Sequence, residues 1–82
     1  MEPNLKLKAA FLTIVDNQLR DNTPPEARET FNRLLAEGYS AEEARELIGS
    51  AIGGELYEML KYGQPYNQDR YLKALCRLPK QS

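Results

Sequence analysis

The sequence predicts an all-α fold, a compact single domain of four helices at about residues 4–20, 25–37, 41–61 and 67–78. Three observations predict it. Apolar residues recur at steps of three and four along most of the chain, which is typical of amphipathic helices. Proline or glycine stands at each expected break, and no run shows the alternation of a half-buried strand. A chain of 82 residues suits one domain, and its ends, residues 1–3 and 80–82, are expected to fray.

The first two helices follow from one apolar stripe each, separated by a turn that proline enforces. The stripe of the first helix consists of Leu7, Phe11, Ile14, Val15 and Leu19. Pro24 and Pro25 then disfavour helical geometry in the residues before them, while proline suits the first position of a helix. The second helix therefore starts at about residue 25, and its inward positions are Ala27, Phe31, Leu34 and Leu35.

The third helix has the clearest start signal of the chain. Gly38 suits the left-handed position that closes the second helix. Ser40 and Glu43 have the spacing of a capping box, in which each side chain bonds the other's backbone N–H. A break at residues 62–65 ends this helix, the longest of the four. Asn67 then opens a short last helix, and Pro79 follows its end.

The predicted core gathers the apolar positions of all four helices, in an orthogonal or bundle-like packing. Its members are Phe11, Ile14, Val15, Phe31, Leu34, Leu35, Leu47, Ile48, Ile52, Leu56, Leu72 and Leu75. Cys76 is expected to be a further small core residue, because free cysteine is among the most buried side chains. The alternative is a reactive thiol activated by Arg77.

Composition excludes several kinds of chemistry. The chain has no histidine and one cysteine, so the usual zinc sets and the Ser-His and Cys-His nucleophile pairs are out of reach. We therefore expect no cofactor and no metal, and the composition favours a non-enzymatic protein over an enzyme without deciding between them. The longest apolar run, Ala9 to Leu12, is too short to span a membrane, and the start does not resemble a secretory signal. A cytoplasmic location is expected.

Three glycines in the third helix, Gly49, Gly53 and Gly54, mark a candidate interaction site. Each costs roughly 1 kcal/mol relative to alanine in a helix interior, so each needs a reason. Gly49 and Gly53 share one face and permit close approach of another backbone. That backbone belongs either to a helix of the same chain or to a second copy in a homodimer. A kink at Gly53 and Gly54 is the third possibility.

Glu55 falls near the centre of the apolar stripe of the third helix, which makes it a candidate buried polar site. A carboxylate facing a core needs a partner, so we expect Glu55 to accept a hydrogen bond from a Tyr, Gln, Asn or Arg side chain. The alternative is an acid or base that works with a tyrosine. A solvent-connected pocket of a few hundred cubic ångströms beside Glu55 would favour a ligand-binding or enzymatic role, and a filled core would favour an interaction module.

The last helix carries a candidate basic face formed by Arg70, Lys73, Arg77 and Lys80, which recur at steps of three and four. The preceding part of the chain, from Glu26 to Glu58, is rich in glutamate. A solvated or salt-bridged face is the first interpretation. Contact with a protein and weak binding of nucleic acid are the others, although the formal net charge of -1 disfavours nucleic acid.

Four segments, NTPPEARETFNRL from Asn22, EGYSAEEA from Glu37, ELYEML from Glu55 and GQPYNQDRYLKAL from Gly63, resemble small bacterial helical proteins of unknown function. The resemblance covers about residues 17–79. It implies a helical fold and a bacterial, cytoplasmic protein, and it brings no catalytic or ligand-binding residues with it.

The expected function is a non-enzymatic protein–protein interaction module, with a protein partner or a second copy of the chain as its partner. The alternative is a small ligand-binding protein or enzyme that uses buried Glu55 with a tyrosine. The third hypothesis is a weak nucleic-acid binder that uses the basic face of the last helix.

Overall fold

The computed structural model describes residues 5–79, and the side chains from residue 8 onward. It contains the helices α1 (Leu5–Asp21), α2 (Pro25–Ala36), α3 (Ala41–Tyr62) and α4 (Gln68–Arg77), and no strand lies within the described residues. The predicted all-α class is confirmed, and each helix boundary lies within one residue of its prediction. The expected fraying of residues 1–3 and 80–82 falls outside the described part of the chain.

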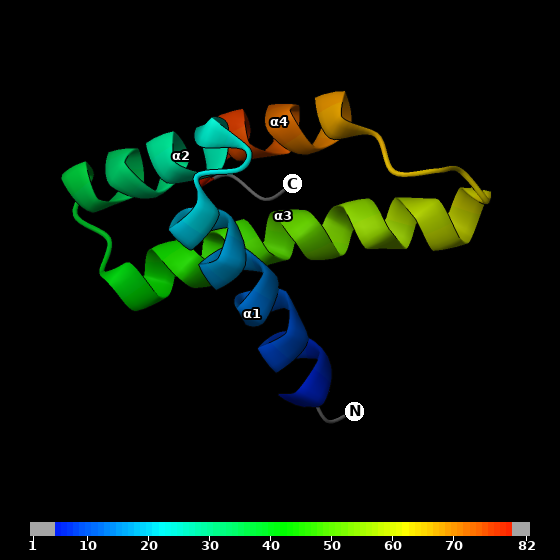
Figure 1. Ribbon diagram of the computed structural model, residues 1–82, viewed down its shortest axis with the longest axis horizontal. Helices are drawn as coiled ribbons and strands as arrows, with labels where there is room; N and C mark the ends of the chain where they lie inside the picture. The colour runs from blue at the N-terminus through cyan, green and yellow to red at the C-terminus, as the bar shows by residue number, and fades with distance from the viewer. Residues whose placement is uncertain (1–4, 80–82) are drawn as a thin grey trace.

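The longest helix, α3, forms the base on which the other helices pack. In Figure 1, α2 and α4 lie along the same side of α3, and α1 crosses α3 near its middle. Arg33 of α2 joins the two shorter helices, because its guanidinium donates to the carbonyl oxygens of Leu75 and Leu78 at 3.0 and 2.8 Å. It therefore adds a second donor to the Leu75 carbonyl, which also accepts from the Leu78 N–H at 3.2 Å, and supplies a donor to the Leu78 carbonyl just beyond the end of α4.

Local capping explains where α2 ends and α3 begins. Gly38 has a φ of 103°, which glycine adopts readily, and the Tyr39 N–H donates to the Leu34 carbonyl at 3.1 Å. Ser40 and Glu43 form the predicted capping box, with side-chain to backbone distances of 3.0 and 2.9 Å. The turn between α2 and α3 is thus defined almost entirely by neighbouring residues.

The core is centred where α1, α2 and α4 meet α3. Predicted core residues Val15, Leu34, Ile48 and Leu75 have no exposed surface. Leu19 and Ala27, expected on the inward faces of their helices, are also buried, and the buried set further includes Ala44, Ala51, Tyr71 and Leu78. Three of these are alanines, which lets the helices pack closely around the larger buried side chains.

The prediction of burial in the core is wrong for three residues. Ile14 and Leu35 are 41% and 39% exposed, and Cys76 is also exposed. Leu35 and Cys76 each follow a fully buried leucine, and one step along a helix rotates a side chain by about 100° away from the neighbour it would pack on. Ile14 lies on the apolar stripe of α1, but no helix covers it there. The reactive-thiol alternative for Cys76 stays a prediction.

Within the described residues, no helix is both long enough and apolar enough to cross a membrane.

Candidate functional site

Gly49 and Gly53 are the points where α1 lies against α3. A Cβ added at Gly53 would lie 3.1 Å from the ring of Phe11, and one added at Gly49 would lie 3.7 Å from the Phe11 Cβ. The face of Gly49 and Gly53 is therefore packed by side chains of α1 in the same chain, at ordinary contact distance at Gly49 and more tightly at Gly53. α3 is helical without interruption across Gly53 and Gly54, and its ribbon runs straight from end to end in Figure 1, which does not support the kink considered from the sequence.

Gly54 has quite different surroundings. It is exposed, and a Cβ built on it would have no heavy atom within 4 Å outside its own helix backbone and chain neighbours. Its backbone is helical and does not require the left-handed geometry that favours glycine. The packing that explains Gly53 therefore does not explain Gly54.

Glu55 is buried, with 6% of its surface exposed, and both carboxylate oxygens accept hydrogen bonds. Arg70 donates from Nε to Oε1 at 3.1 Å and from Nη2 to Oε2 at 2.8 Å, and the Asn67 N–H donates to Oε2 at 2.9 Å. The expectation that Glu55 is buried and accepts a bond from one of four side-chain types is confirmed, and the donor is an arginine. This bidentate pairing of Arg70 with Glu55 fixes α4 against α3.

The loop between α3 and α4 places Arg70. Gly63 ends α3 with a φ of 63°, and Asn67 caps α4 by accepting from the Arg70 N–H at 3.1 Å. The Arg70 guanidinium also donates to Gln64 Oε1 at 2.6 Å. One side chain thus bonds both the loop that carries it and the carboxylate that it faces.

The electrostatics keep Glu55 ionised. The hydrogen bond from Arg70 lowers the pKa of Glu55 below its ordinary value of 4.5, and the Asn67 N–H acts in the same direction against the effect of burial. At neutral pH the group is a carboxylate with both oxygens engaged, so it has no proton to donate. Burial, followed by the charge of Glu55, raises the pKa of Tyr66.

No tyrosine hydroxyl among the described residues bonds Glu55. Tyr71, which is 1% exposed, donates instead to Gln18 Oε1 of α1 at 2.6 Å, and burial raises the pKa of its hydroxyl. Among the described residues, the part-buried hydrogen bonds that join two side chains from different helices therefore fall into two separate pairs, Glu55 with Arg70 and Gln18 with Tyr71.

Two open grooves adjoin the Glu55–Arg70 pair. The first, here called the apolar groove, lies between α1 and the second half of α3 and has a volume of about 260 Å³. Its apolar lining consists of Phe11, Ile14, Ile52, Leu56, Met59, Tyr66 and Tyr71. Its other lining residues are Gln18 and Glu55, and both of these polar side chains are already hydrogen bonded.

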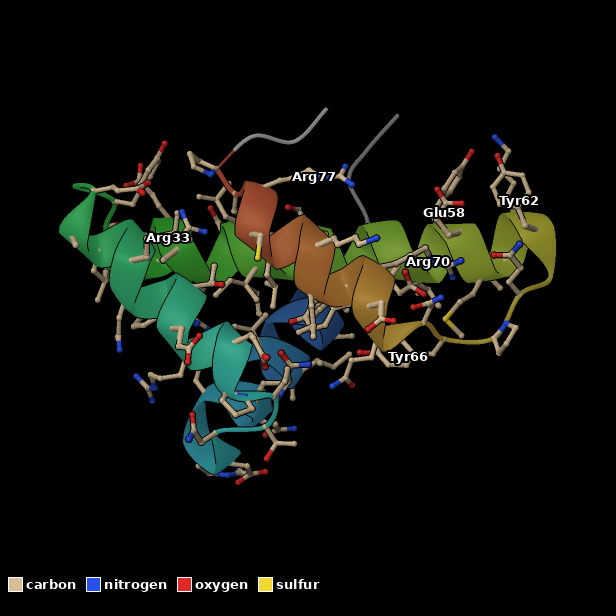
Figure 2. All side chains as sticks on the ribbon, turned by 90° about the horizontal axis from the view of Figure 1, so that it is seen from above. Arg33, Glu58, Tyr62, Tyr66, Arg70 and Arg77 are labelled. Carbon is tan, nitrogen blue, oxygen red and sulfur yellow. The ribbon has the colours of Figure 1, made fainter. Side chains whose placement is uncertain are left out.

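The second, here called the basic groove, lies between α3 and α4 and has a volume of about 360 Å³. Gly54 and Ser50 line its α3 side together with Glu58, and Lys73 and Arg77 line its α4 side. Figure 2 shows Glu58 and Arg77 on one side of α4 and Tyr66 on the other, with Arg70 between α4 and α3.

The predicted basic face is thereby divided. Arg70 pairs with Glu55, and Lys73 and Arg77 line the basic groove, while Lys80 lies outside the described residues. Sequence reasoning did not identify Glu58 as the acidic wall opposite these cations. The helical period places Glu58 beside Glu55 and one turn from Gly54, but the period does not show that α4 faces them.

Among the described residues, no group of three His, Cys, Asp or Glu side chains is arranged to hold a metal ion. No protein-family model matches the chain, and neither a curated protein nor a solved structure matches it closely enough to mark a relative. The resemblance to small bacterial helical proteins therefore stays a prediction from the sequence.

Proposed function

We propose that this chain is a non-enzymatic interaction module that pairs with a second copy of itself through the apolar groove. The observation that carries the proposal is the exposure of Leu60, which is 77% exposed on α3 beside that groove. Tyr57, Tyr62 and Tyr66 in the same part of the chain are each at least half exposed. Large apolar side chains concentrated at one end of a small protein are typical of an interaction surface.

The helical period accounts for the position of Leu60. Leu60 follows Gly53 by seven residues and Gly49 by eleven, so the three positions share one face of α3. α1 covers that face at the glycines and then crosses away from α3 (Figure 1). Beyond the crossing, Leu56 is partly buried against the groove and Leu60 projects into solvent.

This arrangement is self-complementary. A projecting leucine and an apolar groove lie side by side on the same helix, so two copies with antiparallel α3 ends would each insert Leu60 into the partner's groove. Symmetric dimers use such a patch on both subunits. A domain of 82 residues also buries a small share of its surface when alone, which favours self-association.

The geometry gives less support to the enzymatic alternative. Glu55 is ionised with both oxygens bonded, and the nearest buried tyrosine hydroxyl is engaged by Gln18. The open grooves beside Glu55 do meet the volume criterion set for a ligand-binding protein. They support binding without supporting catalysis, so ligand binding remains the second candidate function.

Light scattering coupled to size exclusion tests the proposal over loading concentrations from ~10 μM to ~1 mM. We expect a dimer mass for the natural chain at the upper end of this range and a monomer mass for Leu60→Gln. The matched control is Leu35→Gln, the same change at a partly exposed leucine on α2, which should still dimerise. A monomer mass for the natural chain at every concentration would contradict the proposal.

A further inference from the structure

Gly54 is a helix-interior glycine that the fold does not need. Glycine lowers helix stability relative to alanine, and at Gly53 the ring of Phe11 explains why a larger residue is absent. At Gly54 no neighbouring atom lies where a side chain would be, and the backbone is helical. A side chain at this position would enter the basic groove.

The groove walls carry charges that lack partners inside the described fold. Lys73 and Arg77 are exposed and stand four residues apart on α4, and neither forms an ion pair with a described residue. Arg70 is neutralised by Glu55. Glu58 faces them from α3, so the groove offers two available positive charges and one negative charge.

We propose that the basic groove binds an extended acidic peptide segment, whose backbone passes over Gly54 and whose carboxylates pair with Lys73 and Arg77. Four residues along a helix advance about 6 Å. Alternate side chains of an extended strand lie about 6.6 Å apart on one face. Two acidic residues separated by one residue therefore match the two cations.

The size and charge of the groove favour this ligand over others. A helix with its side chains is about 10–12 Å across, which is wide for an open groove of about 360 Å³, whereas an extended segment is narrower. Nucleic acid binding relies on several cations along a phosphate backbone. Glu58 can accept a hydrogen bond from a peptide N–H, a donor that a phosphate backbone lacks.

This inference does not depend on the proposed dimer, because the basic groove and the apolar groove lie on opposite sides of the Glu55–Arg70 pair (Figure 2). It can be tested in the Leu60→Gln variant, which removes the projecting leucine and leaves every lining residue of the basic groove unchanged. Failure of dimerisation and failure of peptide binding are therefore separate results.

The experiment is a titration of ¹⁵N-labelled protein with the blocked peptide Gly-Glu-Gly-Glu-Gly, followed by amide chemical shifts. We expect saturable shifts at Gly54 and along α4 around Lys73 and Arg77, and no such shifts with the peptide in which both Glu are replaced by Gln. A short single-stranded DNA, added separately, should bind at least ~10-fold more weakly than the acidic peptide.

Two variants separate a defined site from a general attraction between charges. Gly54→Leu fills the groove without changing any charge, and Lys73→Glu reverses one wall; each should weaken peptide binding by ~10-fold or more. Lys61→Glu makes the same charge change outside the groove and should leave binding within about twofold. Unchanged binding by Gly54→Leu, absence of saturable shifts, or tighter binding of DNA than of peptide would each overturn the proposal.

Discussion

Gly53 and Gly54 are consecutive residues of α3, yet they have opposite surroundings. A side chain at Gly53 would meet the ring of Phe11 at 3.1 Å, and a side chain at Gly54 would meet nothing within 4 Å. One step of about 100° around the helix separates a position closed by α1 from a position open to a groove. The packing that accounts for glycine at position 53 therefore does not extend to position 54.

The comparison extends to the two halves of α3. The first half is covered by α1 and α2, and its residues Ala44, Ile48 and Ala51 are buried. The second half retains one buried anchor, Glu55, while Leu60 and Tyr62 are mostly exposed. One half of this helix builds the core, and the other presents two grooves around a single ion pair.

The largest expected effect comes from removing the anchor between the grooves. Glu55→Ala should lower the free energy of unfolding by about 2–3 kcal/mol, because it deletes a buried carboxylate that accepts three hydrogen bonds. Urea denaturation measures this difference. The matched control is Asp16→Ala, which removes the surface pair with Arg45 and should cost at most about 1 kcal/mol. Equal losses in the two variants would contradict the role assigned to Glu55.

The same pair predicts a pH dependence. Because the folded-state pKa of Glu55 lies below its ordinary value of 4.5, its contribution is fully present above about pH 4.5 and is lost as the pH falls through the folded-state pKa. The difference in unfolding free energy between the natural chain and Glu55→Gln should therefore shrink on acidification from pH 6 to pH 3. A difference that stays constant over this range would show that the carboxylate charge contributes nothing.

A smaller effect of opposite sign is expected at Gly54. Gly54→Ala should raise the free energy of unfolding by about 1 kcal/mol, because alanine favours the helix and the added Cβ meets no atom within 4 Å. Thermal unfolding followed by circular dichroism measures the shift. A loss of stability would mean that Gly54 is closed by the fold, as Gly53 is.

The helices were predictable because their signals are local. The capping box at Ser40, the left-handed Gly38 and the spacing of apolar residues each depend on neighbours within one or two turns. The errors at Ile14 and Leu35 have a different origin. A periodic pattern shows which face of a helix is apolar, but not how far along that face the next helix extends.

The candidate site was predictable in its residues but not in its geometry. The position of Glu55 on an apolar face indicated burial and a hydrogen-bonding partner. That the partner is Arg70, fifteen residues later, depends on the path of the loop from Gly63 to Asn67. The division of the basic face and the open side of Gly54 follow from the same long-range placement of α4.

The most direct test of the contrast between the two sides of α3 is the unfolding free energy of Gly53→Leu and Gly54→Leu, measured together by urea denaturation. Gly53→Leu should lose about 2 kcal/mol or more, because leucine would have to displace the ring of Phe11 from its place against α3. Gly54→Leu should be at least as stable as the natural chain. Equal destabilisation by the two variants would contradict the contrast between a closed and an open side of the helix.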